Sequence, residues 1–257
     1  WACKAGKQGI CINQTSMGYQ YPGGFAEEMI VPAAVLKANG VNIIPGDLSF
    51  DEASVTEPLA CALNAQRLIH VGDGDTVLVM GAGPIGCLHV RLARALGATK
   101  VMLADLNGGR LQLSADVVKP DRAIDMSSED LAAIVLEETD GIGPSVIITA
   151  APAGVAQEQA IAMAAPGGRV SFFGGLPKDK PLITVDSNVV HYKELILAGA
   201  NGSSPAQNAE ALALIASGKV PVADLITHRL PLSQVEDAIH AVTSGEAIKV
   251  VIKPQGV

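Results

Sequence analysis

The stretch Gly81-Ala-Gly-Pro-Ile-Gly86 decides the fold of this 257-residue chain. It follows an apolar run, Thr76–Met80, that is typical of a short buried strand, and it opens a helical pattern over Ile85–Leu96. The first glycine permits a tight turn, Gly83 lets the backbone approach a pyrophosphate, and the third lets the helix pack on the strand. Free N–H groups at the start of the helix would hold the pyrophosphate. The alternative is a glycine-rich turn that binds nothing.

An acidic residue stands where a dinucleotide-binding unit needs one. Asp105 follows the next expected strand, Lys100–Ala104, about 20 residues beyond the glycines. A carboxylate at this point can bind the ribose hydroxyls of the cofactor. A solvated carboxylate at a strand end is the alternative. In its strand–turn–helix setting, the combination of loop and acid favours dinucleotide binding.

Short apolar runs alternate with helical stretches on both sides of this loop. Runs rich in Val and Ile, without polar alternation, are typical of parallel strands buried on both faces. We therefore expect an α/β fold with a doubly wound parallel sheet. The expected strands are Thr76–Met80, Lys100–Ala104, Val146–Thr149, Val170–Phe173, Glu194–Ala198 and a last one at Ile248–Ile252, and the expected helices include Ile85–Leu96, Val155–Ala165 and Pro205–Ile215.

Three Ser-x-x-acid patterns predict capped helices. Ser49-x-x-Glu52 opens a helix expected to run to Leu68, and similar patterns begin at Ser127 and Ser233. The first 50 residues are rich in turns, with one short strand expected over Glu28–Pro32.

The composition excludes several classes of protein. The chain carries 18 Lys and Arg against 26 Asp and Glu, a net charge of −8, so we expect no nucleic-acid partner and no binding to an anionic membrane surface. A hydrophobic fraction of 49% excludes intrinsic disorder. No stretch is typical of a membrane span or a leader, and four cysteines do not make a disulfide framework. These observations favour a cytoplasmic globular protein.

Few residues suggest a metal site. Cys3 and Cys11 could be half of a four-ligand zinc site, but taken by themselves they are better explained as two free thiols in a loop. Cys61 and Cys87 are expected to be small buried residues. The five histidines show no metal-binding spacing and are expected to pack or to lie at the surface. Glu57, before Pro-Leu-Ala-Cys, reads as a first-turn acid favoured by the helix dipole.

Several further stretches complete a pattern that extends over essentially the whole chain. With these stretches, the chain resembles the zinc-dependent medium-chain dehydrogenases, and within them the polyol and threonine dehydrogenase branch. The stretches are Gly23-Gly-Phe-Ala-Glu-Glu28, Glu57-Pro-Leu-Ala-Cys-Ala-Leu-Asn-Ala65, Val79-Met-Gly-Ala-Gly-Pro-Ile-Gly86, Ala104-Asp-Leu-Asn107 with Arg110-Leu111, Gly167-Gly-Arg-Val170, Phe173-Gly-Gly-Leu176, Lys193-Glu-Leu195 and Ile248-Lys-Val-Val-Ile252.

The resemblance implies a domain layout and a set of site residues. Residues 57–200 would form a Rossmann NAD-binding domain, and residues 1–56 and 201–257 would be parts of a GroES-like catalytic domain. The implied cofactors are NAD and, in the full-length protein, two kinds of zinc, structural and catalytic. The implied NAD-binding residues are Gly81, Gly83, Ile85, Gly86, Asp105, Arg110, Phe173, Gly174, Gly175, Ala200 and Asn201; Cys3 and Cys11 match structural zinc ligands, and Glu57 matches a catalytic residue in the catalytic zinc environment.

The implied reaction is reversible hydride transfer between a secondary alcohol and NAD, with zinc as a Lewis acid, in a homo-oligomer (dimer or tetramer). Gly202 stands where sorbitol-type members carry an arginine, which favours another polyol, a sugar or an amino alcohol. The family segment with the other zinc ligands would precede Trp1, so a chain that truly begins there is expected to be inactive. Two alternatives remain open: a catalytically silent dinucleotide-binding module, and a zinc-free reductase of the same fold.

Overall fold

A computed structural model describes residues 1–256. The chain divides into two compact units, one formed by residues 1–61 and 201–257 and the other by residues 62–200. The division falls within the long helix α3, Thr56–Leu68, whereas the sequence places it at the start of that helix.

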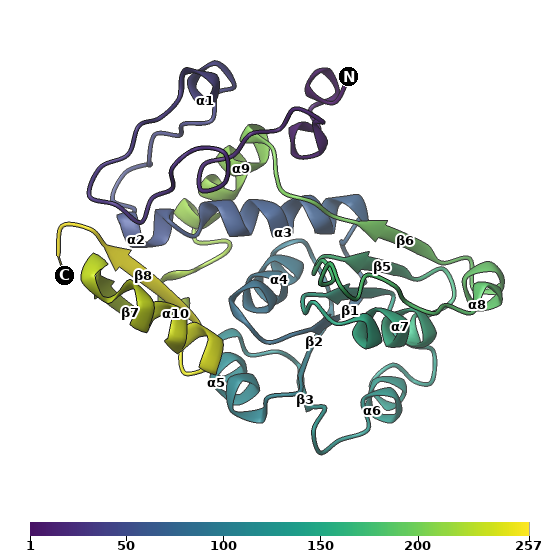
Figure 1. Cartoon of the computed structure of the whole chain (residues 1–257). Helices are drawn as coiled ribbons and strands as arrows, with labels where there is room; N and C mark the ends of the chain where they lie inside the picture. The colour runs from purple at the N-terminus through teal and green to yellow at the C-terminus, as the bar shows by residue number, and fades with distance from the viewer. Residues whose placement is uncertain (257) are drawn as a thin grey trace. The chain divides into compact units, whose positions relative to one another are not determined.

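The unit of residues 62–200 contains a six-stranded parallel sheet with the order β3-β2-β1-β4-β5-β6 (Figure 1). Every residue of β1 after its first is buried, and successive side chains alternate between faces, so both faces of the sheet are covered. This is the expected doubly wound α/β fold. The strands are β1 Thr76–Met80, β2 Lys100–Asp105, β3 Arg122–Asp125, β4 Val146–Thr149, β5 Arg169–Phe172 and β6 Ile196–Gly199.

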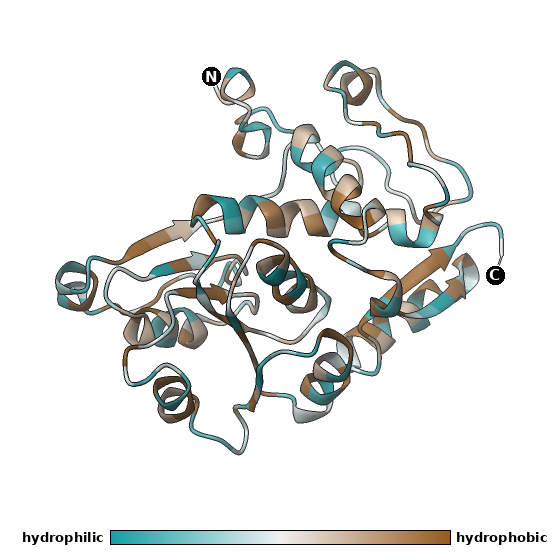
Figure 2. Ribbon diagram, turned by 180° about the vertical axis from the view of Figure 1, so that it is seen from behind, coloured by the Kyte–Doolittle hydropathy of each residue, from teal (hydrophilic) through white to brown (hydrophobic). Residues whose placement is uncertain are grey.

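Helices connect these strands and cover them. α4 packs on β1 and β2, α5 on β2 and β3, and α7 on β4 and β5. Hydrophobic residues concentrate along the strands and on the helix faces toward them (Figure 2), and β1, β4, α6 and α7 contribute to one apolar core cluster. The helices are α4 Pro84–Ala95, α5 Gly108–Val118, α6 Leu131–Glu137, α7 Gly154–Met163 and α8 Ser187–Tyr192.

The other unit joins the two ends of the chain. Asp51 accepts hydrogen bonds from Arg229 (2.6 Å) and Lys253 (2.5 Å), and the Lys253 ammonium is the main reason that the pKa of Asp51 lies below its usual value. Strands β7 and β8 pair in parallel. The elements are the 3-10 turns Cys3–Ala5, Gln8–Ile10, Ala223–Leu225 and Leu232–Gln234, helices α1 Ala33–Lys37, α2 Phe50–Ala53, α9 Pro205–Ala216 and α10 Val235–Ser244, and strands β7 Ile226–Pro231 and β8 Lys249–Lys253.

The helix expected from Ser49 to Leu68 is two helices in the structure. Ser49 and Glu52 form the expected capping box, but α2 ends at Ala53. The Ser54 hydroxyl donates to the carbonyl oxygen of Asp51 at 2.6 Å, and such a bond competes with continuation of the helix.

Three other local expectations were wrong. The helix predicted from Ser127 begins at Leu131, because Asp130 is its N-cap and accepts two backbone N–H groups. The helix predicted from Ser233 begins at Val235 without a side-chain cap. The stretch Glu28–Pro32 is not a strand, since a strand requires a pairing partner and the described chain offers it none.

Candidate functional site

The glycine loop joins β1 to α4 at the carboxyl edge of the sheet. Gly81 has a φ of +117°, which residues with a side chain rarely adopt. A Cβ atom on Gly86 would lie 1.8 Å from the carbonyl oxygen of Gly81, so α4 can begin this close to the loop only with glycine there. Gly83 has an ordinary φ of −73°, and a Cβ atom there would project into open space. The loop thus leaves a cradle beside Gly83.

The cradle lies at the position where parallel sheets of this order bind ligands. Gly83 is the N-cap of α4 and makes no side-chain cap, and Pro84 follows it. The first N–H groups of a helix have no partner within the helix, so those of Ile85 and Gly86 can meet an anion. The order of strands reverses between β1 and β4, which makes this edge a topological switch point.

Asp105 lies beside the loop, at the end of β2. Its side chain is buried, and its Oδ2 accepts the N–H of Ala82 at 2.7 Å. Its Oδ1 accepts the N–H of Asn107, also at 2.7 Å. The sequence did not single out Ser114, whose hydroxyl donates to the Ala82 carbonyl at 2.6 Å. Both backbone polar groups of Ala82 are therefore bonded to side chains, and the Asp105 carboxylate is attached to the loop.

A second acid, Asp125, ends β3 opposite Asp105, with which it is in register. Its Oδ1 accepts the hydroxyl of Ser127 at 2.6 Å and the backbone N–H of Ser127 at 2.9 Å, and these bonds lower its pKa. Sequence reasoning missed it because β3 is too short to stand out. Arg110, expected to bind the cofactor, lies in the first turn of α5, where its backbone N–H donates to the N-cap side chain of Asn107.

Phe173, Gly174 and Gly175 follow β5 at the same edge of the sheet. The N–H of Gly174 donates to the Thr149 carbonyl at 2.8 Å, and Gln157 donates to the Gly174 carbonyl at 3.2 Å. A Cβ atom on Gly174 would lie 2.7 Å from the carbonyl oxygen of Ala151. The loop is therefore fixed against the end of β4 and the start of α7.

Ala200 is the last residue of the unit that contains the sheet, and Asn201 begins the second segment of the other unit. The N–H of Ala200 donates to the Phe172 carbonyl at 3.3 Å and extends the edge of the sheet. The side-chain amide of Asn201 donates to the carbonyl oxygen of Gly9 at 2.9 Å. A Cβ atom on Gly9 would lie 2.7 Å from the Asn201 carbonyl oxygen, so the two backbones are in close contact. The amide nitrogen of Asn201 thus holds the turn that lies between Cys3 and Cys11.

Glu57 lies in the first turn of α3, and its side chain is exposed rather than enclosed by apolar neighbours. Its Oε1 accepts the thiol of Cys61, one turn later, at 3.1 Å. Burial, together with the charge of Glu57, raises the pKa of Cys61 to about 12, so this thiol stays protonated. Burial lowers the pKa of Lys249, and the charge of Glu57 opposes that effect. Glu57 therefore lies near polar groups of its own unit, the Cys61 thiol and the Lys249 ammonium.

The sulfur atoms of Cys3 and Cys11 lie 3.9 Å apart. Two thiolates bound to one zinc at about 2.3 Å in tetrahedral geometry have their sulfurs about 3.8 Å apart. The pair thus fits two adjacent corners of a structural zinc site. Within residues 1–256, no three His, Cys, Asp or Glu side chains are grouped so as to hold a metal ion. Glu57 is accordingly a single candidate ligand for a catalytic zinc.

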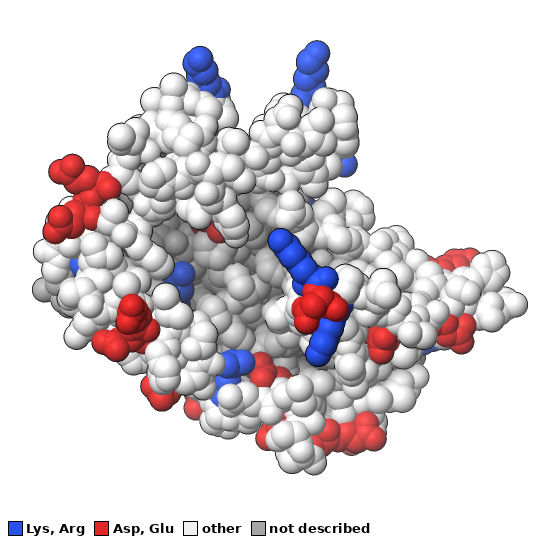
Figure 3. Space-filling model, in the orientation of Figure 1, with Lys and Arg blue, Asp and Glu red and all other residues white. Residues whose placement is uncertain are grey.

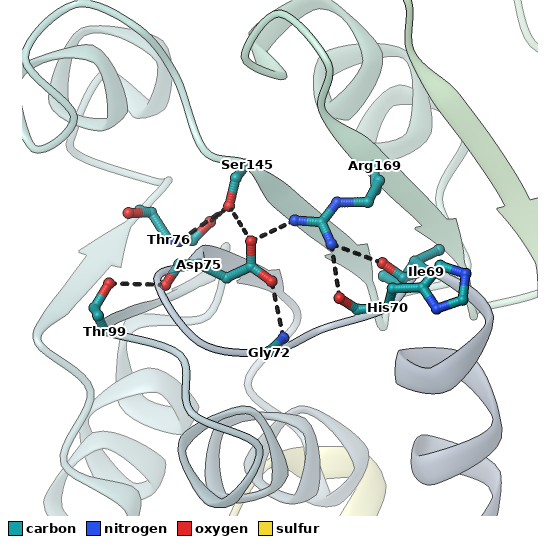
Figure 4. Close-up of polar contacts among 8 residues, drawn as sticks. All are labelled: Ile69, His70, Gly72, Asp75, Thr76, Thr99, Ser145 and Arg169. Atoms are coloured by element: carbon teal, nitrogen blue, oxygen red, sulfur yellow. Dashed lines mark hydrogen bonds and ion pairs between the residues drawn. The ribbon is translucent and has the colours of Figure 1, made fainter.

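A polar network at the opposite edge of the sheet explains Arg169, which belongs to one of the stretches that carry the family resemblance (Figure 4). Arg169 forms an ion pair with Asp75 and donates to the carbonyl oxygens of Ile69 and His70. Asp75 also accepts the hydroxyl of Ser145 at 2.8 Å. These residues lie at the amino ends of β1, β4 and β5, away from the glycine loop, so we assign Arg169 to the fold rather than to the site.

On the face shown in Figure 3, Lys and Arg side chains are scattered and do not gather into one large basic patch. Over the part of the chain that the structure describes, no helix is both long and apolar enough to cross a membrane.

Comparison with known structures identifies similar folds. A zinc-binding dehydrogenase from Sinorhizobium meliloti 1021, bound to NADP, superposes with a TM-score of 0.88 at 28% identity over 98% of this chain and 72% of that chain. An alcohol dehydrogenase from Escherichia coli CFT073, in complex with NADH, also superposes with a TM-score of 0.88, at 27% identity and the same coverage.

Comparison with known sequences agrees. The chain is 32% identical to a sorbitol dehydrogenase of Halalkalibacterium halodurans over 98% of this chain and 71% of that protein. It is also 32% identical to an L-threonine 3-dehydrogenase of Chromobacterium violaceum, over 97% of this chain and 70% of that protein. The family model described as zinc-binding dehydrogenase matches residues 84–217. The resemblance noted in the sequence is thereby confirmed, and the chain belongs to the zinc-binding dehydrogenases.

Proposed function

We propose that this chain is a zinc-dependent alcohol dehydrogenase that transfers a hydride between a secondary alcohol and NAD. The observation that carries the proposal is the Asp105 carboxylate bonded to the glycine loop at the switch point of the sheet. The names of its relatives, sorbitol and threonine dehydrogenases, support a polyol or an amino alcohol as substrate.

The geometry supports a specific placement of the cofactor. The pyrophosphate would lie in the cradle beside Gly83, on the first N–H groups of α4. Each carboxylate oxygen of Asp105 accepts one backbone N–H and keeps a free lone pair, with which it can accept a ribose hydroxyl. Ile85 and the Phe173–Gly175 loop would then form the walls around the nicotinamide, with Ala200 at the same end.

The structure also supports residues for zinc. Cys3 and Cys11 would hold the structural ion, and their separation favours this assignment over a zinc-free reductase. Glu57 would contribute to the catalytic zinc. A bound catalytic zinc supplies a Lewis acid for the alcohol oxygen. This chain would contribute to that zinc site the Glu57 carboxylate, which the Cys61 thiol positions by a hydrogen bond.

The edge strand β6 supports a homo-oligomer. This strand is the outermost one at its side of the sheet, and its residues Ile196 and Leu197 are 51% and 37% exposed. An apolar edge strand with unpaired backbone groups is a surface that another strand can cover. A second copy of this chain, pairing through β6, would extend the sheet across a dimer. The dimer or tetramer expected from the sequence stays a prediction.

Calorimetric titration of NAD and NADP tests the cofactor assignment. We expect the unmodified chain to bind NAD at least about tenfold more tightly than NADP, because the 2′-phosphate would face the charges of Asp105 and Asp125, and a like-charge contact costs several kcal/mol. Asp105→Ser should weaken NAD binding and bring the affinities for NAD and NADP closer together. Asp116→Ser removes an exposed acid from α5 and serves as the control. Equal or tighter binding of NADP by the unmodified chain would contradict the assignment.

Removing Glu57 tests the metal assignment. In the full-length protein, which would carry the segment with the other zinc ligands, Glu57→Ala should lower the zinc content and the rate of NAD-dependent alcohol oxidation by about tenfold or more, the effect typical of groups in the metal environment, while NAD affinity stays nearly constant. Glu236→Ala removes an exposed acid from the first turn of α10 and is the matched control. An unchanged zinc content and unchanged rates across polyols and amino alcohols would instead show that Glu57 is only a first-turn acid that interacts favourably with the helix dipole.

A further inference from the structure

His89 is a fully buried residue of α4, one helical turn after Ile85. The side-chain amide nitrogen of Gln66 lies 3.1 Å from His89 Nδ1 and donates to the His89 carbonyl oxygen at 2.9 Å. The imidazole ring is therefore fixed in orientation by a neighbouring helix of the same unit. Residues at positions i and i+4 share a face of a helix, so Ile85 and His89 face the same side.

The ring is a neutral imidazole with one unpaired nitrogen. Burial lowers the pKa of His89 to about 3. If Nδ1 accepts from the Gln66 amide, the proton of the neutral ring is on Nε2. Within the described chain, neither His89 Nε2 nor Gln66 Oε1 has a hydrogen-bond partner. A buried polar group without a partner costs stability, and a leucine would avoid that cost. Packing by itself therefore gives no reason for an imidazole at this position.

The imidazole does contact an aromatic ring. The centroids of His89 and Phe173 lie 4.6 Å apart, and the two rings are nearly perpendicular at 85°. Phe173 is half-buried and begins the loop after β5. The backbone of that loop is held by the hydrogen bond from Gly174 to Thr149, whereas the Phe173 ring packs against His89 of α4. The contact thus links the helix that follows the glycine loop to the loop on the other side of the switch point.

We propose that His89 is a positioning residue, which fixes the Phe173 ring as a wall for the nicotinamide end of the cofactor. This inference rests on the proposed function. It assigns a role to a histidine that sequence patterns leave as packing, because the contact joins residues far apart in the chain. It predicts that a change at His89 affects the nicotinamide half of NAD and leaves the adenosine half unaffected.

Calorimetric titration of NAD and of ADP-ribose, which lacks nicotinamide, tests the proposal. His89→Leu keeps the volume and removes the ring. We expect His89→Leu to weaken NAD binding by about three- to tenfold, the range that an edge-to-face contact contributes, and to leave ADP-ribose binding unchanged. His89→Phe keeps an aromatic ring and should bind NAD like the unmodified chain. Phe173→Leu should reproduce the His89→Leu result, and combining the two should cause no further loss.

The possible outcomes separate this role from a structural one. Equal weakening of NAD and ADP-ribose by His89→Leu would make His89 a residue of the fold and overturn the proposal, as would unchanged NAD binding by a folded variant. If His89→Leu does not fold, Phe173→Leu and His89→Phe decide the question, since additive losses or a loss in His89→Phe would also overturn it. An unmodified chain that binds neither ligand would instead refute the proposed function, and this inference with it.

Discussion

Gly86→Ala is expected to lower the free energy of unfolding by about 3 kcal/mol and to abolish NAD binding. The added Cβ would lie 1.8 Å from the carbonyl oxygen of Gly81, which is backbone and cannot rotate away. Either the first turn of α4 moves off the loop, or the loop moves away from β1. Both movements displace the N–H groups that would hold the pyrophosphate. Urea denaturation followed by circular dichroism measures the first effect, and calorimetry with NAD the second.

Gly83→Ala is the matched control for this result. Gly83 has an ordinary φ, and its added Cβ would meet no atom within 4 Å, so the stability should change by less than about 1 kcal/mol. The same methyl group enters the cradle, so NAD affinity should fall by about tenfold or more. A Gly83→Ala variant that binds NAD as tightly as the unmodified chain would show that the pyrophosphate lies elsewhere. A Gly86→Ala variant of normal stability would show that α4 has room to shift.

The loop could be predicted from the sequence because its chemistry is local. Tight turns and close helix packing require glycine at fixed spacing, so Gly81 and Gly86 are recognisable without knowledge of the rest of the fold. The β1 and β4 strands could be predicted with their bounds, since continuous burial on both faces gives an unbroken apolar run.

Elements with weak local signals could not be predicted. Strand β3 could not be recognised in the sequence, because it has only four residues and begins with an arginine and ends with an aspartate. The helices predicted from Ser127 and Ser233 began too early, because the spacing of a capping box occurs by chance where another residue caps or none does. Side chains that act through distant partners were missed for a related reason. His89 and Arg169 acquire their roles from residues on other elements, and a single sequence does not show those pairings.

Arg169→Met is expected to destabilise the unit of residues 62–200 by about 3 kcal/mol, as breaking a buried ion pair does. The two side chains of the pair are only 19% and 10% exposed, so the variant would leave Asp75 without its cationic partner at a place that little solvent reaches. The hydroxyl of Ser145 and the N–H of Gly72 would still bond to the carboxylate, but they bring no compensating charge. The carbonyl oxygens of Ile69 and His70 would also lose their donor (Figure 4).

The chain offers a matched control in Arg122→Met. Arg122 also opens a strand, β3, and pairs with Glu129, but the side chains of that pair are 37% and 31% exposed. Solvent screens such a pair, so its loss should cost less than about 1 kcal/mol. Asp75→Asn combined with Arg169→Met should recover part of the loss, because it removes the uncompensated charge. Urea denaturation of the four proteins measures these differences. Equal effects of the two arginine variants would show that Arg169 is screened like a surface residue, whereas a much larger effect of Arg169→Met with unchanged NAD affinity in the folded protein would confirm that this motif residue serves the fold and not the cofactor.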